Sequence, residues 1–362
     1  MTLRYGIIGS GMMGQEHIRN IKLLEATEIV AVADPDEGMR TSAADLAGPG
    51  CKTFADHRDL LGADLCDVIV IAAPNDLHHR LLKDVMATDR PILVEKPVCS
   101  TVADSKDILA MADRRQAPVW VAMEYRYMPP VARLISETHA GRFGTPKMIA
   151  IREHRYPFLD KVGHWNRFNR RSGGTLVEKC CHFFDLMRLL ARSEAVRVYA
   201  SGALDVNYAD ESYEDGRPDI LDNAFVILDF ENGMRAMLDL CMFAEGSYWQ
   251  ERISVTGSTA RGEAFVPGPA RFSPDGRERH AEFAVATRET RQEVREIVPV
   301  DPEILAAGDH HGSTFYQHRH FREMVLTGGK PAVTVEDGFK SVLIGAAAET
   351  SARTGMAVDL TS

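Results

Sequence analysis

The sequence has no long hydrophobic run and no excess of positive charge. No apolar stretch approaches the roughly 20 residues that span a bilayer. The formal net charge is −10, with 42 Lys and Arg against 52 Asp and Glu, and this acidic balance argues against nucleic acid as a partner. We therefore expect neither a membrane nor a nucleic-acid partner.

Cysteine is scarce and irregularly placed. The six cysteines are Cys51, Cys66, Cys99, Cys180, Cys181 and Cys241. Cys180 and Cys181 are adjacent, and adjacent side chains on a helix project about 100° apart. No further Cys or His pair has the spacing of a zinc site, so we expect no metal. Scattered thiols in an acidic chain fit a reducing cytoplasm, and the opening MTLRYGIIGSG lacks the apolar core of a signal peptide.

A glycine-rich motif stands near the start of the chain. An apolar strand, residues 3–8, leads into Gly9-x-Gly11-x-x-Gly14, and a helical pattern follows. Three such glycines allow a tight turn, close approach of a pyrophosphate and close packing of helix on strand. The helix N-terminus then offers free N–H groups to the phosphates. The predicted cofactor loop contains Gly9, Gly11, Met12, Met13 and Gly14.

The next apolar strand, EIVAVAD, ends in a carboxylate that bears on cofactor choice. This residue, Asp34, lies 20 positions after Gly14. A carboxylate at that spacing binds the adenosine ribose hydroxyls and would repel a 2′-phosphate. We therefore predict NAD rather than NADP; the alternative is a glycine-rich turn that binds no nucleotide.

Apolar strands and helices alternate through the first third of the chain. Further strands are predicted at 51–54, 67–74, 91–97 and 118–125. This alternation predicts an α/β fold with a parallel, doubly wound sheet, which binds ligands beyond the carboxyl ends of its strands. Further cofactor contacts are therefore expected at two strand ends, from Pro74, Asn75, His78, Glu95 and Lys96.

Several motifs occur in a characteristic order. G-x-G-x-x-G is followed by A-x-P-N-x-x-H, by E-K-P on the fifth strand, by G-G-T-L-x-E-x-x-x-H-x-x-D at 173–185 and by a closing helix within 328–355. This set, which covers nearly the whole chain, resembles the Gfo/Idh/MocA family of NAD(P)-dependent sugar and cyclitol oxidoreductases. The resemblance implies a Rossmann dinucleotide-binding domain, 1–124, and an α+β domain, 125–362, for substrate binding and oligomerisation.

The resemblance further implies that the second domain contains a large, open, mostly antiparallel sheet. The residues support this independently, because five strand-like segments surround a helical stretch at 174–191: MIAIREHRY, VRVYASGAL, NAFVILDFE, RAMLDLCMF and ERISVTGS. We expect the final helix, about 336–355, to pack back on the first domain. The family pattern implies a homodimer or homotetramer formed through the open sheet.

The helical stretch includes VEKCCHFFDLMRL, in which Glu178 and His182 are four residues apart and Asp185 follows three later. These spacings place all three on one helix face. A Glu–His pair of this kind is most often a surface hydrogen bond, and a histidine here is otherwise a capped core residue. Cys180 and Cys181 are expected to pack as small apolar groups.

The family pattern instead implies that this helix brings an acidic residue and a histidine over the nicotinamide, opposite the lysine of E-K-P. His182 would then take the hydroxyl proton of an alcohol. Lys96, whose alternative role is a strand-end salt bridge, would stabilise the developing alkoxide. Glu178 would orient the imidazole or bind a neighbouring hydroxyl, although the family more often has Asp there.

Residues 152–171 form a basic island, with six Arg and Lys against two carboxylates, so the island carries +4 and the remainder −14. Such an excess suggests an anionic substrate. The alternatives are solvation, cofactor pyrophosphate contacts and subunit contacts. The substrate residues predicted from the island and its surroundings are Arg126, Arg152, Arg155, Lys161, His164, Trp165, Arg167, Asp185 and His311.

Three functions remain open at this stage. The first is an NAD-dependent oxidoreductase acting on a ring secondary alcohol of a sugar, sugar acid or cyclitol. The second is an NAD-dependent redox-neutral glycosidase that oxidises, eliminates, hydrates and reduces; E-K-C-C-H resembles the sulfoquinovosidase-like branch weakly, which suggests a sulfosugar substrate. The third is a nucleotide-sensing regulator without catalysis, which the joint presence of Lys96 and His182 disfavours.

Overall fold

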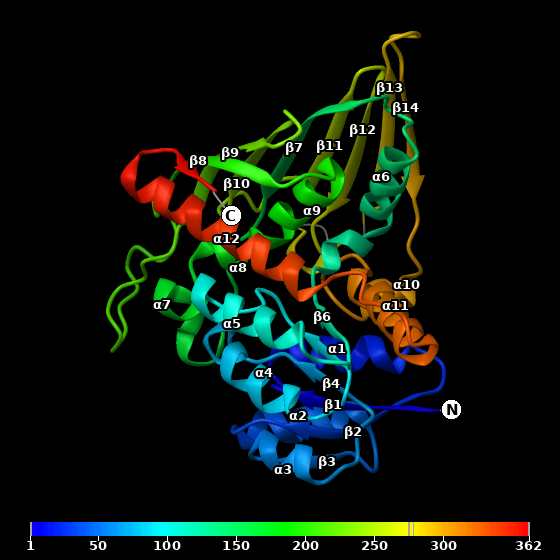
Figure 1. Ribbon diagram of the computed structural model, residues 1–362, viewed down its shortest axis with the longest axis vertical. Coiled ribbons are helices and arrows are strands. Elements are labelled where there is room, and N and C mark those ends of the chain that lie inside the picture. Colours follow the sequence, from blue (N-terminus) through cyan, green and yellow to red (C-terminus); the bar gives the residue numbers. More distant parts are fainter. Residues whose placement is uncertain (1, 274–275, 278, 361–362) are drawn as a thin grey trace.

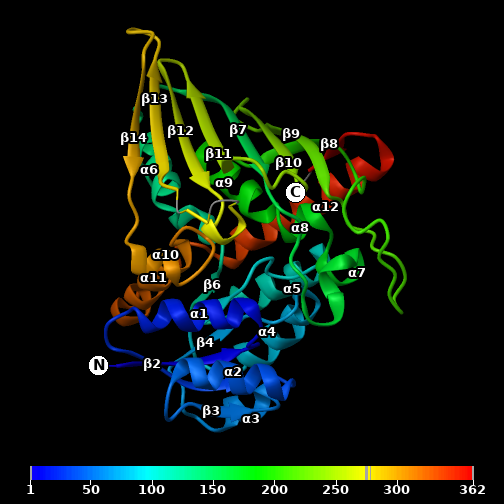
Figure 2. The same ribbon diagram turned by 180° about the vertical axis from the view of Figure 1, so that it is seen from behind.

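The computed structural model describes residues 2–273, 276–277 and 279–360. The chain contains two β-sheets, and the second lies above the first in Figures 1 and 2. The first sheet is parallel and has the order β3-β2-β1-β4-β5-β6. Its strands are β1 (Leu3–Ile8), β2 (Thr27–Ala33), β3 (Lys52–Phe54), β4 (Val68–Ile71), β5 (Ile92–Val94) and β6 (Val119–Val121). The predicted Rossmann fold is confirmed.

Helices cover both faces of this sheet, and the strands β4, β5 and β6 are buried throughout. Aspartate or threonine caps three of the helices, where Asp36, Asp56 and Thr101 accept a backbone N–H of the first turn. The helices are α1 (Met12–Lys22), α2 (Glu37–Ala47), α3 (His57–Gly62), α4 (His78–Met86) and α5 (Val102–Ala112), with short 3₁₀ turns η1 (Asn75–Leu77) and η2 (Glu124–Tyr127).

The second sheet has the order β14-β13-β12-β11-β7-β10-β9-β8-β15 and is antiparallel except where β7 meets β10. It contains β7 (Pro146–His154), β8 (Ala195–Ala203), β9 (Asn223–Phe230), β10 (Arg235–Cys241), β11 (Trp249–Gly257), β12 (Ala260–Pro267), β13 (Ala281–Thr287), β14 (Glu293–Val298) and β15 (Val358–Asp359). The five predicted strands are β7 to β11. The large, mostly antiparallel sheet is confirmed, and β12 to β15 extend it beyond the prediction.

One face of the second sheet packs against α6 (Pro129–His139), α9 (Cys181–Ala191) and α12 (Val335–Thr354) (Figure 1). No helix of the described residues covers the opposite face. Strand alternation points large apolar side chains outward there, and the register places Tyr199, Ile227 and Met237 in one row across β8, β9 and β10. Ile227 is 51% exposed.

The predicted continuous helix over 174–191 is wrong. The chain forms α8 (Thr175–Glu178) and then α9, and only two residues, Lys179 and Cys180, lie between the two helices. The Cys180 amide donates to the Thr175 carbonyl five residues back, at 3.3 Å, so the regular ladder is interrupted as in a π-type bulge. This break turns α9 relative to Glu178.

Two C-terminal helices connect the sheets. α11 (Ser313–Thr327) packs against α1 and η2, whereas α12 contacts α5 and β6 as well as α8, α9 and β8. The remaining short helices are η3 (Val162–Arg167), α7 (Asn169–Ser172), η4 (Ala270–Phe272) and α10 (Pro302–Ala306). None of the helices in the described chain is long and apolar enough to cross a membrane.

Candidate active site

A cavity of about 730 Å³ runs from the carboxyl ends of the parallel strands to the helices of the second sheet. Its lining begins at the glycine-rich loop and includes Gly9, Gly11, Met12 and Met13. It continues to Lys96, Glu178 and His182. The predicted cofactor loop and the predicted catalytic residues therefore share one cavity.

The glycine loop leaves no room for side chains where it crosses β4 and enters α1. A Cβ on Gly9 would lie 2.5 Å from the Ala72 carbonyl oxygen, and Gly9 has φ of +89°. A Cβ on Gly14 would lie 2.2 Å from the Gly9 oxygen. At Gly11, in contrast, no heavy atom lies within 4 Å, so the open side of the loop has space for a pyrophosphate.

Asp34 lies at the end of β2 and lines the cavity. Its carboxylate accepts the backbone N–H groups of Ser10, at 2.8 Å, and Asp36, at 2.9 Å. These bonds fix the carboxylate beside the glycine loop, where remaining lone pairs can accept ribose hydroxyls. The Asp34 carboxylate and the glycine loop together fit the ribose and the pyrophosphate of a dinucleotide.

The polar strand ends divide into cavity residues and supporting residues. Pro74 and Asn75 line the cavity, and the Asn75 amide donates to the Ser172 carbonyl at 3.1 Å. His78 is fully buried, and its ring nitrogens lie 2.8 and 3.0 Å from the carbonyl oxygens of Pro97 and Ala73. The prediction that His78 contacts the cofactor is therefore replaced by a role in joining two strand ends.

Lys96 and Glu95 follow β5. The Lys96 ammonium donates to the Glu178 carbonyl oxygen at 3.0 Å. Burial opposes its charge, but neighbouring Cys181, Glu178 and Glu95 leave the pKa of Lys96 above its ordinary value. Glu95 lies 2.9 Å from His17 on α1, so this carboxylate also ties β5 to the first helix.

His182 is buried and stacks on the Tyr125 ring, with centroids 4.1 Å apart and planes 8° apart. Burial, followed by the charges of Lys96 and Lys179, holds the pKa of His182 well below its ordinary value. The imidazole is therefore neutral and able to accept a proton. Its Nδ1 atom has no hydrogen-bond partner within the described chain.

Glu178 is buried and does not hydrogen-bond His182 among the described residues, because the helix break separates them. Its Oε1 atom accepts from Lys161 at 3.2 Å, and its Oε2 atom is buried without a partner. The expectation that Glu178 orients the imidazole is not met; Tyr125 supports the ring instead. Glu178 retains an acceptor oxygen in the cavity wall.

The basic island is largely neutralised within the molecule. Lys161 pairs with Glu178 and lies 4.4 Å over the Trp165 ring; both side chains line the cavity. Arg155 also lines the cavity, 3.6 Å from Glu153. The pairs are Arg155–Glu153, Lys161–Glu178, Arg167–Glu211, Arg167–Asp160, Arg170–Asp215 and Arg171–Asp76.

Six predicted substrate residues do not line this cavity in the described structure. Arg167 and His164 both bind Asp160, at 3.3 and 3.0 Å. Arg152 alternates with the inward-facing Ile151 and Glu153 on β7, so its side chain is directed to the open face. These positions correct the expectation that His164, Arg152 and Arg167 touch the substrate.

Arg126 and Asp185 form a buried pair with each other. The guanidinium donates to both carboxylate oxygens, at 2.5 and 2.6 Å, and also lies 3.5 Å from Asp337 at the start of α12. This bidentate pair joins η2, α9 and α12 rather than reaching substrate. The prediction that either residue binds substrate is thereby corrected.

His311 faces a neighbouring cavity near η4, whereas its neighbour His310 lines the main cavity. Both lie in the sequence GDHHGS, and no periodicity there distinguishes them. The prediction that His311 contacts the substrate is therefore corrected, and the adjacent His310 lines the main cavity instead.

Comparison with known proteins agrees with this geometry. A family model described as oxidoreductase family, NAD-binding Rossmann fold, matches residues 3–123, and one described as oxidoreductase family, C-terminal alpha/beta domain, matches residues 137–360. The chain belongs to the Gfo/Idh/MocA family. Its first domain is thus an NAD-binding Rossmann domain, which confirms the predicted cofactor and resemblance.

Similar members of the Gfo/Idh/MocA family extend over the same length. Myo-inositol 2-dehydrogenase from Thermotoga maritima is 25% identical over 364 residues, covering 96% of each chain. An uncharacterized oxidoreductase from Bacillus subtilis is 27% identical over 357 residues, covering 98% of this chain and 96% of that protein. Levoglucosan dehydrogenase, solved with NADH and levoglucosan, has a TM-score of 0.83 at 20% identity over 100% of both chains.

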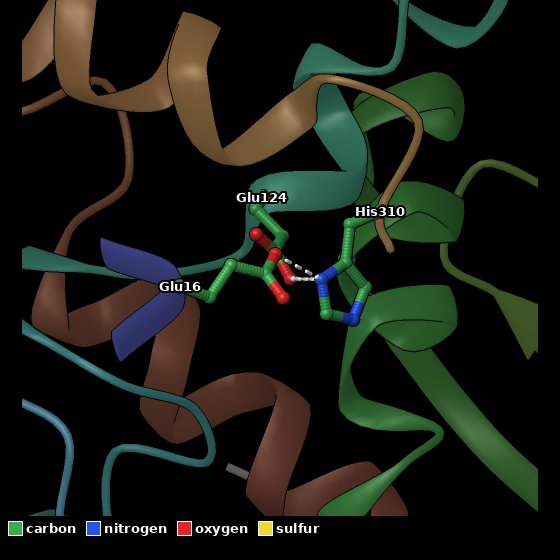
Figure 3. A group of neighbouring side chains, drawn as sticks. All are labelled: Glu16, Glu124 and His310. Carbon is green, nitrogen blue, oxygen red and sulfur yellow. Dashed lines mark hydrogen bonds and ion pairs between the residues drawn. The ribbon is translucent and has the colours of Figure 1, made fainter. Parts of the chain in front are cut away.

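In this Gfo/Idh/MocA protein, sequence reasoning missed several cavity residues. Glu16 on α1, Glu124 after β6 and Lys179 in the helix break all line the cavity. Figure 3 shows Glu16, Glu124 and His310 directed toward one another. Glu124 was detectable, because it follows a parallel strand at its carboxyl end; the others had no pattern pointing to this site.

Proposed function

We propose that the protein is an NAD-dependent dehydrogenase of a sugar or cyclitol, oxidising a ring secondary alcohol. The observation that supports this most directly is the shared cavity of the dinucleotide loop, Lys96, Glu178 and His182. The 25% identity to a myo-inositol 2-dehydrogenase over almost the full length supports the same substrate class.

The three side chains have complementary capacities. When bound, NAD accepts a hydride from the substrate carbon. His182 is neutral and can take the hydroxyl proton, while the charged Lys96 can stabilise the oxygen as that proton leaves. Oε2 of Glu178 is a buried acceptor that has no partner among the residues the structure describes, and it is suited to a neighbouring hydroxyl of a polyol.

We further propose that the substrate is neutral rather than anionic. At the substrate end of the cavity, most cations have a carboxylate neighbour: Lys161 pairs with Glu178 and His310 with Glu16, while Arg155 and Lys179 share Glu153. The island therefore offers little uncompensated charge to a carboxylate or sulfonate. This pairing removes the sequence-based support for an anionic sugar, including a sulfosugar.

The open face of the second sheet suggests a homo-oligomer. Its apolar row of Tyr199, Ile227 and Met237 is continuous with Phe225, which is 62% exposed. Contiguous exposed apolar side chains of this kind mark protein contacts. We propose that a second copy of the chain covers this face.

The test is to present purified protein and NAD with neutral cyclitols, neutral sugars and matched sugar acids, such as glucose against glucuronate, each sugar as free compound and as glycoside. NADH formation and aglycone release are followed separately. Net NADH with a neutral polyol is the expected result. Aglycone release without net NADH would establish the glycosidase instead, and preference for the acids would restore the anionic substrate.

A further inference from the structure

His310 reaches the cavity from the loop before α11 and is held there from one side. Its Nδ1 atom lies 2.7 Å from Oε1 of Glu16 and 3.5 Å from Oε1 of Glu124 (Figure 3). These carboxylates come from α1 and η2, so three distant segments converge on one imidazole. The ring centroid of His310 is 6.2 Å from that of Tyr125, on which His182 stacks.

Counting protons in this cluster assigns its charges. The Thr314 hydroxyl lies 3.0 Å from Oε1 of Glu16 and 2.6 Å from Oε2 of Glu124. A hydroxyl carries one proton and cannot donate fully to both carboxylates. A proton on one carboxyl group, donated to the Thr314 oxygen, would satisfy both contacts.

Burial and neighbouring charges identify that group as Glu124. Burial raises the pKa of Glu124 above its ordinary value. Burial also opposes charge on Glu16, but His310 and Thr314 outweigh it and lower the pKa of Glu16 to about 2. Against burial, Glu124 and Glu16 raise the pKa of His310 to about 9. Together with the Thr314 contacts, these directions favour a Glu16–His310 ion pair, with Glu124 as the carboxyl group that holds the additional proton.

The free edge of the imidazole faces the cavity. His310 lines the cavity with its side chain 24% exposed, and its Nε2 atom points away from both carboxylates (Figure 3). No hydrogen bond to Nε2 occurs within the described residues. Lys179 is a further charged group at this end of the cavity, and it opposes the positive charge on His310. The neighbouring His182 is neutral.

We propose that Glu16, Glu124 and Thr314 hold His310 as a doubly protonated imidazole whose Nε2–H donates to an oxygen of the substrate. The ligand class is a hydroxyl or ring oxygen of a neutral polyol, since the cluster itself has no net charge. This inference rests on the proposed dehydrogenase function and names a specificity residue for it. His310 supplies a fixed donor from the C-terminal part of the chain.

A divalent cation is the competing occupant. One ligand atom from each of Glu16, Glu124 and His310 lies within 4.8 Å of the others. A metal would require the imidazole nitrogen and both carboxylates to be free of protons. The Thr314 geometry instead needs a proton on one carboxyl group, which favours the protonated imidazole.

The matched variants Glu16→Gln and Glu124→Gln separate these possibilities. Nitrogen NMR of the NAD-bound enzyme at pH 8 should show both His310 nitrogens protonated in wild type and in E124Q, because a neutral amide replaces a neutral acid. In E16Q the anion is lost, so one nitrogen should be deprotonated. H310N identifies the signals. The proposal would be overturned if E16Q and E124Q reduced the protonation of His310 equally and the wild-type enzyme bound one Mn²⁺ or Zn²⁺ per chain.

Kinetics then test the contact with substrate. H310F should raise KM about 10- to 100-fold, the loss of a hydrogen bond to a charged donor, while H310Q, which keeps a neutral donor, should raise KM less. The H310F penalty should vanish for the one deoxy analogue that lacks the contacted oxygen. An equal penalty for every analogue, or an Nε2–H signal unmoved by saturating polyol, contradicts the proposal. If no polyol is oxidised, the proposed dehydrogenase function fails. The protonation of His310 seen by NMR and the shift of its Nε2–H signal on addition of polyol still decide the proposal about His310.

Discussion

At the scale of single residues, Lys96 and His182 carry the proposed proton chemistry. Lys96→Ala and His182→Ala should each reduce kcat/KM on the order of 10²- to 10⁴-fold, because each removes one partner in charge stabilisation or proton transfer. The measurement is steady-state NADH formation with the best polyol. Retention of NAD binding and of the circular dichroism spectrum serves as the folding control, and near-normal turnover in either folded variant would refute the assignment.

Asp34 provides a second test at this scale. Because its carboxylate is fixed beside the glycine loop by the N–H groups of Ser10 and Asp36, we expect NAD to bind more tightly than NADP. Titration of both cofactors into the protein measures the preference, and each tenfold difference corresponds to about 1.4 kcal/mol. Asp34→Asn should narrow the gap by weakening repulsion of the 2′-phosphate; equal affinities in wild type would be inconsistent with this role.

At the scale of secondary-structure elements, the break between α8 and α9 shapes the environment of the catalytic histidine. It directs Lys179 inward, where its ammonium donates to the Tyr125 hydroxyl at 2.5 Å and pairs with Glu153 at 2.8 Å. Tyr125 in turn stacks on His182. The break thus places one cation behind the ring that supports the histidine.

This arrangement predicts a shifted pH profile. Lys179 is one of the charges that lower the pKa of His182, so Lys179→Met should raise that pKa. His182 must be neutral to accept a proton, and the acidic limb of kcat/KM against pH should therefore move to higher pH. Lys179→Arg keeps the charge and should leave the limb near its original place. A limb that stays fixed in Lys179→Met would show that the cation does not tune the histidine.

The same elements show how far sequence patterns reach. Strand and helix alternation predicted the Rossmann sheet, because buried parallel strands read as short apolar runs bounded by turns. The four-residue spacing of Glu178 and His182 predicted that they share one helix face, and this prediction was wrong. A break in the helical hydrogen bonds leaves no trace in the spacing of residues along the sequence. The excess charge inferred for the basic island has a related cause. Local composition shows the cations, but carboxylate partners such as Glu211, which pairs with Arg167, are distant in sequence.

The residues proposed to be catalytic stand in recognisable motifs, whereas the residues that support them do not. Lys96 and His182 stand at positions that a family pattern identifies. Tyr125 supports the His182 ring from η2, and His310 lines the cavity from the loop before α11, a helix that packs against both α1 and η2. No local period records such long-range contacts, so these residues require the structure.

At the scale of the whole molecule, the open sheet leads to a prediction about assembly. The row of Tyr199, Ile227 and Met237 lies on the face away from the catalytic helices, so a change there should alter association without entering the cavity. Ile227→Lys would bury an ammonium in an apolar interface, which is costly without a partner. We expect light scattering to show an oligomer for wild type and a smaller species for Ile227→Lys at the same concentration.

The control is a lysine introduced at an exposed position on the helical side, Glu336→Lys at the start of α12, which should leave the mass unchanged. The thermal unfolding temperature of Ile227→Lys should become independent of protein concentration, whereas that of wild type should rise with concentration, because association stabilises the folded chain by mass action. A wild-type protein that is monomeric at every concentration, or a variant that keeps the full oligomer mass, would assign the apolar face another role. Since Ile227 does not line the cavity, retained NAD binding in the smaller species would confirm that the substitution acts on assembly rather than on folding.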